Sequence, residues 1–165
     1  MKRIFIIFLL LPSLFVGCGS DVRPPGFPKL YPVSLKVMQE GVPLADASVS
    51  LRIAVNSMTW SIGGVTDKHG VAVLWTHGKF RGAPEGTFKV AVDKVVNEGE
   101  DEMNAAANRG DMAAAARIQV NSYSFVNEEY GTIATTPIEI EITRKSRVID
   151  VDAGAAVKLR REYLR

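Results

Sequence analysis

Residues 138–143 read Ile-Glu-Ile-Glu-Ile-Thr, so that apolar and polar residues alternate along the whole stretch. Successive side chains of a β-strand point to opposite faces of the sheet. The alternation therefore predicts a strand whose isoleucines are buried and whose glutamates face water. Strands with one packed and one solvated face are typical of antiparallel sheets.

The same two-residue period recurs earlier in the chain. It is present at 33–38, 48–53 and 88–93, and residues 71–75 form a short continuous apolar run. Segments rich in Gly, Pro and Asp separate these stretches and favour turns. Short strands at this spacing predict a mainly all-β fold, an antiparallel β-sandwich of the Ig-like or transthyretin-like kind.

Residues 96–125 interrupt the strand pattern. An acidic run at 98–102 is followed by alanine-rich stretches on both sides of Gly110. Because alanine has the highest helix propensity and glycine a low one, we expect one or two short helices here. The acidic run fits the first turn of a helix, where the helix dipole favours negative charge. Calcium binding is the alternative, although the spacing of an EF-hand loop is missing.

The two ends of the chain differ in character. Residues 1–17 begin with a basic tripeptide, continue as an apolar run and end on glycine, as a bacterial signal peptide does. A membrane span is the alternative, but it needs about 20 apolar residues. We expect a flexible tether at 18–31, which is rich in Pro and Gly. Residues 153–165 are expected to form a short helix or a tail with a basic end.

The tetrapeptide Phe15-Val16-Gly17-Cys18 resembles the lipobox of bacterial lipoproteins, with Phe15 where that motif usually has Leu. The resemblance implies lipidation of the Cys18 thiol, cleavage before Cys18 and acylation of the new amine. Cys18 is the only cysteine, so it has no disulfide partner within the chain. Two or more acyl chains give stable membrane residence. Gly19 after the cysteine implies sorting to the outer membrane.

The charge balance bears on possible partners. The sequence has 20 basic and 18 acidic side chains, and the loss of Lys2 and Arg3 with the signal makes the two numbers equal. A nucleic-acid-binding domain is usually strongly basic. We therefore expect no nucleic acid partner.

Four segments carry a further family resemblance, at 32–37, 41–49, 64–70 and 83–90. They resemble the turn motifs of carboxypeptidase regulatory-like, transthyretin-like domains, which are frequent in short lipoproteins of planctomycetes. Residues 128–138 are similar to the segment that leads into the last strand of that family. The resemblance implies a transthyretin-like sandwich at 32–152 in which 96–125 is an insertion without a counterpart.

The segment Thr66-Asp67-Lys68-His69-Gly70 is interpreted as a structural turn, because Asp accepts bonds from nearby amides and Gly permits positive φ. Contact of Asp67 with a ligand or a cation is the alternative. His69 and His77 are about 26 Å apart if the chain between them is extended. One metal ion does not bridge that distance, so we expect no metal site and two solvent-exposed histidines.

Aromatic residues provide the other candidate contacts for sugars or peptides. Trp75 lies in the apolar run and is expected in the core. Trp60 has small polar neighbours and is the residue we expect to form an exposed ligand contact.

No nucleophile motif is recognisable: a Gly-x-Ser-x-Gly elbow is missing, and lipidation would consume Cys18. The hydroxyisourate hydrolases share the transthyretin fold but end in Tyr-Arg-Gly-Ser, whereas this chain ends in Tyr-Leu-Arg. We therefore expect no enzyme and no cofactor. The sequence favours a membrane-anchored envelope lipoprotein, a non-catalytic structural or protein-interaction module that contacts envelope proteins or polysaccharide. The alternative is a carbohydrate- or small-ligand-binding module that uses Trp60 and residues 96–125.

Overall fold

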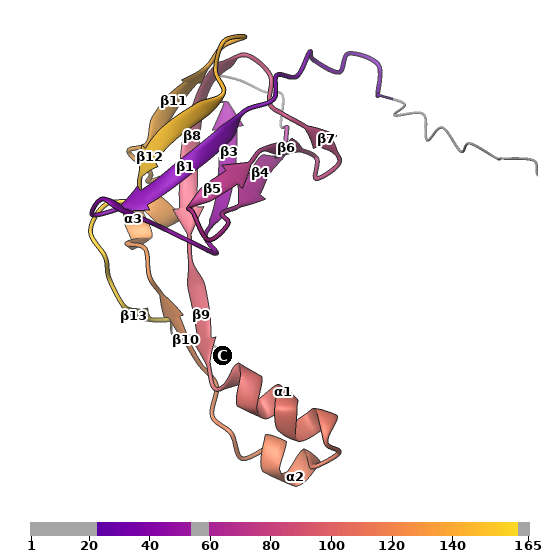
Figure 1. The fold of residues 1–165 in the computed structure, drawn as a ribbon, viewed down its shortest axis with the longest axis vertical. Coiled ribbons are helices and arrows are strands. Elements are labelled where there is room, and N and C mark those ends of the chain that lie inside the picture. Colours follow the sequence, from indigo (N-terminus) through magenta and orange to yellow (C-terminus); the bar gives the residue numbers. More distant parts are fainter. Residues whose placement is uncertain (1–22, 54–59, 162–165) are drawn as a thin grey trace, which may run out of the picture.

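The computed structural model describes residues 23–53 and 60–161. The fold is a mainly β, sandwich-like arrangement of two sheets with a helical insertion, as the sequence predicts (Figure 1). The first sheet contains β1 (Ser34–Gln39), β2 (Val42–Pro43), β5 (Val71–Val73) and β12 (Val148–Asp152). The second has the order β11 (Glu139–Ile142), β8 (Gly86–Asp93), β3 (Ser48–Ile53), β4 (Ile62–Val65), β6 (Trp75–Thr76) and β7 (Phe80–Arg81).

The predicted alternation decides which side chains form the core. In β11 the residues Ile140 and Ile142 are buried, whereas Glu139 and Glu141 are exposed. Strands β1 and β3 alternate in the same way, as does β8 apart from the buried Ala91, and the three strands supply many of the large apolar side chains between the sheets. These are Leu35, Val37, Val49, Leu51, Phe88, Val90 and Val92. The burial of these side chains is the main favourable contribution to folding.

Strands β4 and β12 are among those that have no clear signal in the sequence. Strand β4 contains Gly63 and Gly64, and glycine is depleted in strands. Strand β12 contains two aspartates and pairs in parallel with β1, with Leu35 opposite Ile149. The sandwich is therefore antiparallel except at this one described pair of strands.

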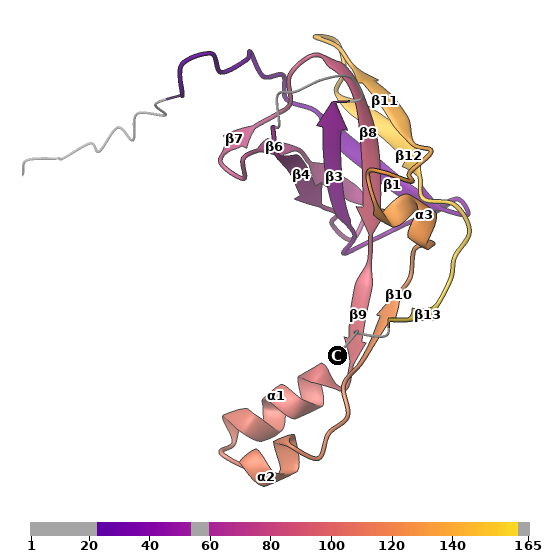
Figure 2. The same cartoon turned by 180° about the vertical axis from the view of Figure 1, so that it is seen from behind.

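An arm extends from the sandwich. Strand β9 (Val95–Glu98) continues β8 after one residue and pairs with β10 (Asn121–Ser124), so that Glu98 lies opposite Asn121. Helices α1 (Glu100–Asn108) and α2 (Met112–Ala115) form a tip at the far end of this ribbon (Figure 2). The prediction of one or two short helices, interrupted at Gly110, is confirmed, and there are two. The two strands that carry them were not predicted.

The C-terminal segment is not helical over its described part. Strand β13 (Leu159–Arg160) pairs with β10, with Tyr123 opposite Arg160. Of the two alternatives expected for 153–165, a short helix or a tail, the helix is therefore wrong over the described residues 153–161. The short helix α3 (Glu128–Gly131) lies instead where the arm rejoins the sandwich.

The N-terminal segment is attached to the sandwich before β1 begins. Tyr31 and Ala83 form a bridge of two backbone hydrogen bonds, of 2.9 and 3.1 Å. The signal peptide and Cys18, which the sequence predicts at 1–18, lie outside the described residues. Among the residues that are described, no helix is long and apolar enough to cross a membrane.

Candidate functional site

Trp75 lies on the outer face of the six-stranded sheet, contrary to the expectation that it belongs to the core. Leu74 and Thr76 take the inward positions and are fully buried, so the residue between them must point outward. The Trp75 side chain is 40% exposed. In a continuous apolar run the residue types do not show which side chains face the core and which face outward. This is why Trp75 was expected on the wrong face of the sheet.

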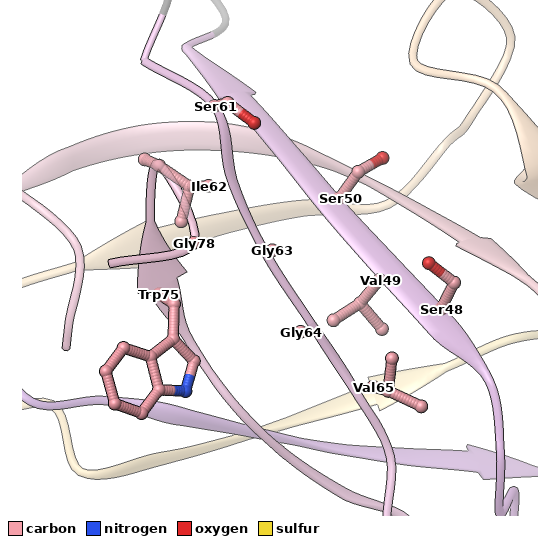
Figure 3. Close-up of a pocket in the computed structure, with 10 residues that line it drawn as sticks. All are labelled: Ser48, Val49, Ser50, Ser61, Ile62, Gly63, Gly64, Val65, Trp75 and Gly78. Atoms are coloured by element: carbon pink, nitrogen blue, oxygen red, sulfur yellow. The ribbon is translucent and has the colours of Figure 1, made fainter. Parts of the chain in front are cut away.

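A hollow of about 500 Å³ lies beside Trp75 on this face. Across the sheet, Gly63 is the register partner of both Trp75 in β6 and Ser50 in β3. Figure 3 shows Trp75 and the serines of β3 on opposite sides of β4, with the two glycines between them. The residues that line the hollow are Ser48, Val49, Ser50, Ser61, Ile62, Gly63, Gly64, Val65, Trp75 and Gly78.

The two glycines are required by the packing of β4. A Cβ atom on Gly63 would lie 2.5 Å from the Val49 carbonyl oxygen, and one on Gly64 would collide with the Val73 carbonyl oxygen in the opposite sheet. Close backbone approach of this kind excludes any larger residue. The outward position of Gly63 therefore carries no side chain, and the floor of the hollow stays open.

The polar groups of the hollow are uncharged. Ser48, Ser50 and Ser61 supply hydroxyl groups that make no side-chain hydrogen bond within residues 23–53 and 60–161. A hydroxyl group both donates and accepts hydrogen bonds. The hollow thus combines one exposed indole with hydroxyl groups that have spare hydrogen-bonding capacity.

Trp60, the tryptophan expected to be exposed, is half-buried and packs against the edge of the core. Its ring lies 5.0 Å from that of Phe27 and 5.3 Å from that of His77, and Phe27 is 4.7 Å from Phe80. These edge and tilted arrangements are the favoured geometries of aromatic pairs. The cluster fixes the segment that was expected to be a tether onto the sandwich at Phe27. A ligand contact of Trp60 stays a prediction.

Cations surround this aromatic cluster. Arg23 lies 5.8 Å from the Phe27 ring and 6.0 Å from the Phe80 ring, and Lys79 lies 5.3 Å from Phe80. Contacts of this length are within the range of cation–π attraction. They add to the attachment of the N-terminal segment at this end of the sandwich.

The turn at Asp67 has the structure that the sequence predicts. The N–H groups of His69 and Val71 donate to Asp67 Oδ1 over 2.8 and 2.9 Å, and Gly70 has a φ of 74°. Because these N–H groups, that of Val71 first, stabilise the carboxylate, the pKa of Asp67 lies below its usual value. His69 and His77 are both exposed, as expected.

This pKa shift predicts a pH-dependent stability difference between the protein and its Asp67→Asn variant. The lowered pKa in the folded state means that the charged form contributes stability above the unfolded pKa of about 3.9, and that this contribution is lost as the pH falls through the folded pKa. We expect the protein to have the higher urea midpoint at pH 7, with the gap closing in acid. A gap of equal size at pH 7 and pH 2 would contradict this assignment.

The basic end of the chain braces the arm. Lys158 Nζ lies 2.6 Å from Glu98 Oε1 in β9 and 4.4 Å from the ring of Tyr123 in β10. The hydrogen bond to Glu98 raises the pKa of Lys158. At the base of the arm, Arg161 Nη2 lies 2.5 Å from Asp93 Oδ1. These contacts join the C-terminal segment to both strands of the ribbon.

The last three residues of the acidic run form the first turn of α1, as the helix-dipole argument predicts, whereas Glu98 lies in β9. Glu100, Asp101 and Glu102 are the first residues of this helix, and Asn97 donates a side-chain hydrogen bond to Glu100 over 2.7 Å. Over the described ranges, no cluster of three or more His, Cys, Asp or Glu side chains is arranged to hold a metal ion.

Comparison with known proteins gives no relative: no family model, no curated protein and no solved structure matches this chain. The roles of the arm and of the Trp75 hollow therefore follow from the residues that form them.

Proposed function

We propose that this chain is a lipid-anchored, non-catalytic interaction module of the bacterial envelope, held in the outer membrane through Cys18, and that its arm contacts a protein partner. The arm is the observation that carries this proposal. Connections between the elements of a compact domain are usually only about 4–6 residues long, and much longer ones are usually either functional or disordered. This one forms a braced ribbon with a folded tip, which the sandwich does not need for its own core.

The placement of the two ends of the molecule supports this proposal. The N-terminal segment leaves the sandwich near β7, and the tip of the arm lies at the opposite end in both views (Figures 1 and 2). Phe27, which is docked, lies nine positions after Cys18, a span of at most about 30 Å. A lipid on Cys18 would hold the Phe27 end close to the bilayer and leave the tip pointing away from it.

The surface of the tip also supports a contact with protein. Helices of this length are not stable alone in water. Here Ala106 and Ala115 are buried where the two helices pack together, while Met112 is 66% exposed. Methionine is over-represented at adaptable binding surfaces because its side chain is flexible and polarisable.

The anchor is tested by labelling with a fatty-acid probe. Cells that produce the protein or its Cys18→Ser variant are grown with an alkyne fatty acid, and the purified proteins are compared. We expect label on the protein and none on the variant. Equal labelling of the two would refute the anchor.

The role of the arm is tested by removing its tip. Because Glu98 and Asn121 are register partners, an Asn-Gly turn in place of residues 99–120 closes the ribbon as a two-residue hairpin. This tipless variant keeps Cys18, the sandwich and β13. We expect cross-linking in intact cells to recover at least one envelope protein with the full chain and to lose it with the tipless variant. Recovery of the same proteins with both, at equal yield and melting temperature, would refute the role of the tip.

A further inference from the structure

We propose that the hollow beside Trp75 binds an uncharged saccharide, with one pyranose ring stacked on the Trp75 indole. This inference does not depend on the lipid anchor or on the arm. It places carbohydrate recognition on the sheet face at Trp75, whereas the alternative interpretation of the sequence placed it at Trp60 and residues 96–125.

The exposure of Trp75 is the first argument. A tryptophan opposite a glycine covers the gap in the neighbouring strand, which accounts for the buried part of the ring. The remaining 40% of the Trp75 side chain faces solvent, whereas its neighbours on the same face, Ser50 and Gly63, are small. Tryptophan combines a large apolar surface with one N–H donor, and such rings are favoured where one side meets a ligand.

The spacing across the sheet is the second argument. Adjacent strands lie about 4.8 Å apart, and Gly63 lies on the strand between those of Trp75 and Ser50. The backbones at Trp75 and Ser50 are therefore about 10 Å apart. That gap accommodates one sugar ring. A ring stacked on the indole can lie over Gly63 and present its far hydroxyl groups to Ser50 and Ser48.

The chemistry of the lining selects the class of ligand. Sugar hydroxyl groups donate and accept hydrogen bonds, as the hydroxyl groups of Ser48, Ser50 and Ser61 do. None of the residues that line the hollow is charged. Phosphorylated or carboxylated ligands would therefore lack a counter-charge at the site, and a metal ion would lack carboxylate or imidazole ligands.

The test is a titration with neutral hexasaccharides. The full-length protein is purified from whole cells lysed in a detergent without a sugar headgroup and mixed with maltohexaose, cellohexaose or chitohexaose. Trp60→Phe leaves Trp75 as the only tryptophan and conserves the aromatic cluster around Phe27. We expect at least one of the three sugars to shift the Trp75 emission saturably.

Substitutions then locate the site by calorimetry. Trp75→Ala is expected to weaken binding of that sugar by about tenfold or more, and Ser50→Ala by a smaller factor. Val42→Ala, which removes an apolar side chain that is 64% exposed on the other sheet, is the matched control and is expected to leave the Kd unchanged. Melting temperatures confirm that each variant is folded.

Three results would overturn the proposal. The first is a flat response to all three sugars, and the second is an unchanged Kd in Trp75→Ala. The third is a light-scattering mass of two copies that falls to one copy in Trp75→Ala, since that result would assign the face to self-association. Equal fatty-acid labelling of the protein and Cys18→Ser, which would refute the anchor, does not alter any of these outcomes, so failure of the anchor and failure of the sugar site are separable.

Discussion

Replacement of Phe88 by alanine is expected to lower the free energy of unfolding by about 3–5 kcal/mol. Phe88 is fully buried in β8, which lies between β3 and β11 in the six-stranded sheet. Its ring fills the space between the two sheets, and alanine would leave a cavity that the paired strands on both sides prevent from closing. Proteins of this kind have total stabilities of about 5–15 kcal/mol, so the loss is a large part of the whole.

Urea unfolding followed by far-ultraviolet circular dichroism measures this change. Val65→Ala is the control, because Val65 is an apolar residue in the same sheet whose side chain is 65% exposed. Its replacement is expected to change stability by less than about 0.5 kcal/mol. A loss below about 1 kcal/mol in Phe88→Ala would show that the core is not packed around this ring.

Replacement of Thr66 by valine is expected to cost about 2–4 kcal/mol, although the two side chains have almost the same shape. Thr66 is 2% exposed. Its Oγ1 donates to the Leu44 carbonyl over 2.6 Å and accepts from the Ala47 N–H over 2.8 Å. Valine leaves both backbone groups buried without a partner, and each such group costs about 1–3 kcal/mol.

The matched control for this prediction is Thr66→Ser. Serine keeps the hydroxyl group and removes one methyl group, which is worth about 0.8 kcal/mol when buried. We therefore expect serine to be tolerated better than valine in the same urea experiment. The reverse order would show that Thr66 acts through its methyl group and not through its two hydrogen bonds.

The predictable part of this fold is the part that depends on side-chain periodicity. Residues 138–143 alternate strictly, and the structure buries Ile140 and Ile142 as that alternation requires. The tip of the arm was also predictable, because alanine and glycine act through the local helix propensity of residues 96–125. In both cases the signal lies within a few residues of the element that it specifies.

The features that escaped prediction depend on pairing between distant residues. Strand β13 is held in place because Lys158 and Arg161 donate hydrogen bonds to Glu98 and Asp93, more than 55 positions earlier in the chain. The role of Thr66 likewise depends on Leu44, which is distant in sequence. No local pattern encodes these partners.

The candidate site was missed for the same reason. The hollow exists because Gly63 pairs with Trp75 on one side and with Ser50 on the other, and register of this kind is not visible in one sequence. The available signal would have been an alternation in residues 71–76 that showed which side chains face the core. It was hidden because Ala72, Leu74 and Trp75 are all apolar.

The way in which β9 continues β8 has a mechanical consequence. Only Lys94 separates the two strands, and β8 is hydrogen-bonded on both edges within the sandwich, to β3 and to β11. A pull on the tip of the arm would load β8 along its own length. The ladders on both edges would then be sheared together instead of being peeled open one bond at a time. With the proposed anchor at one end and the proposed partner at the other, tension would thus pass through a strand that is paired on both edges, and the module would resist extension.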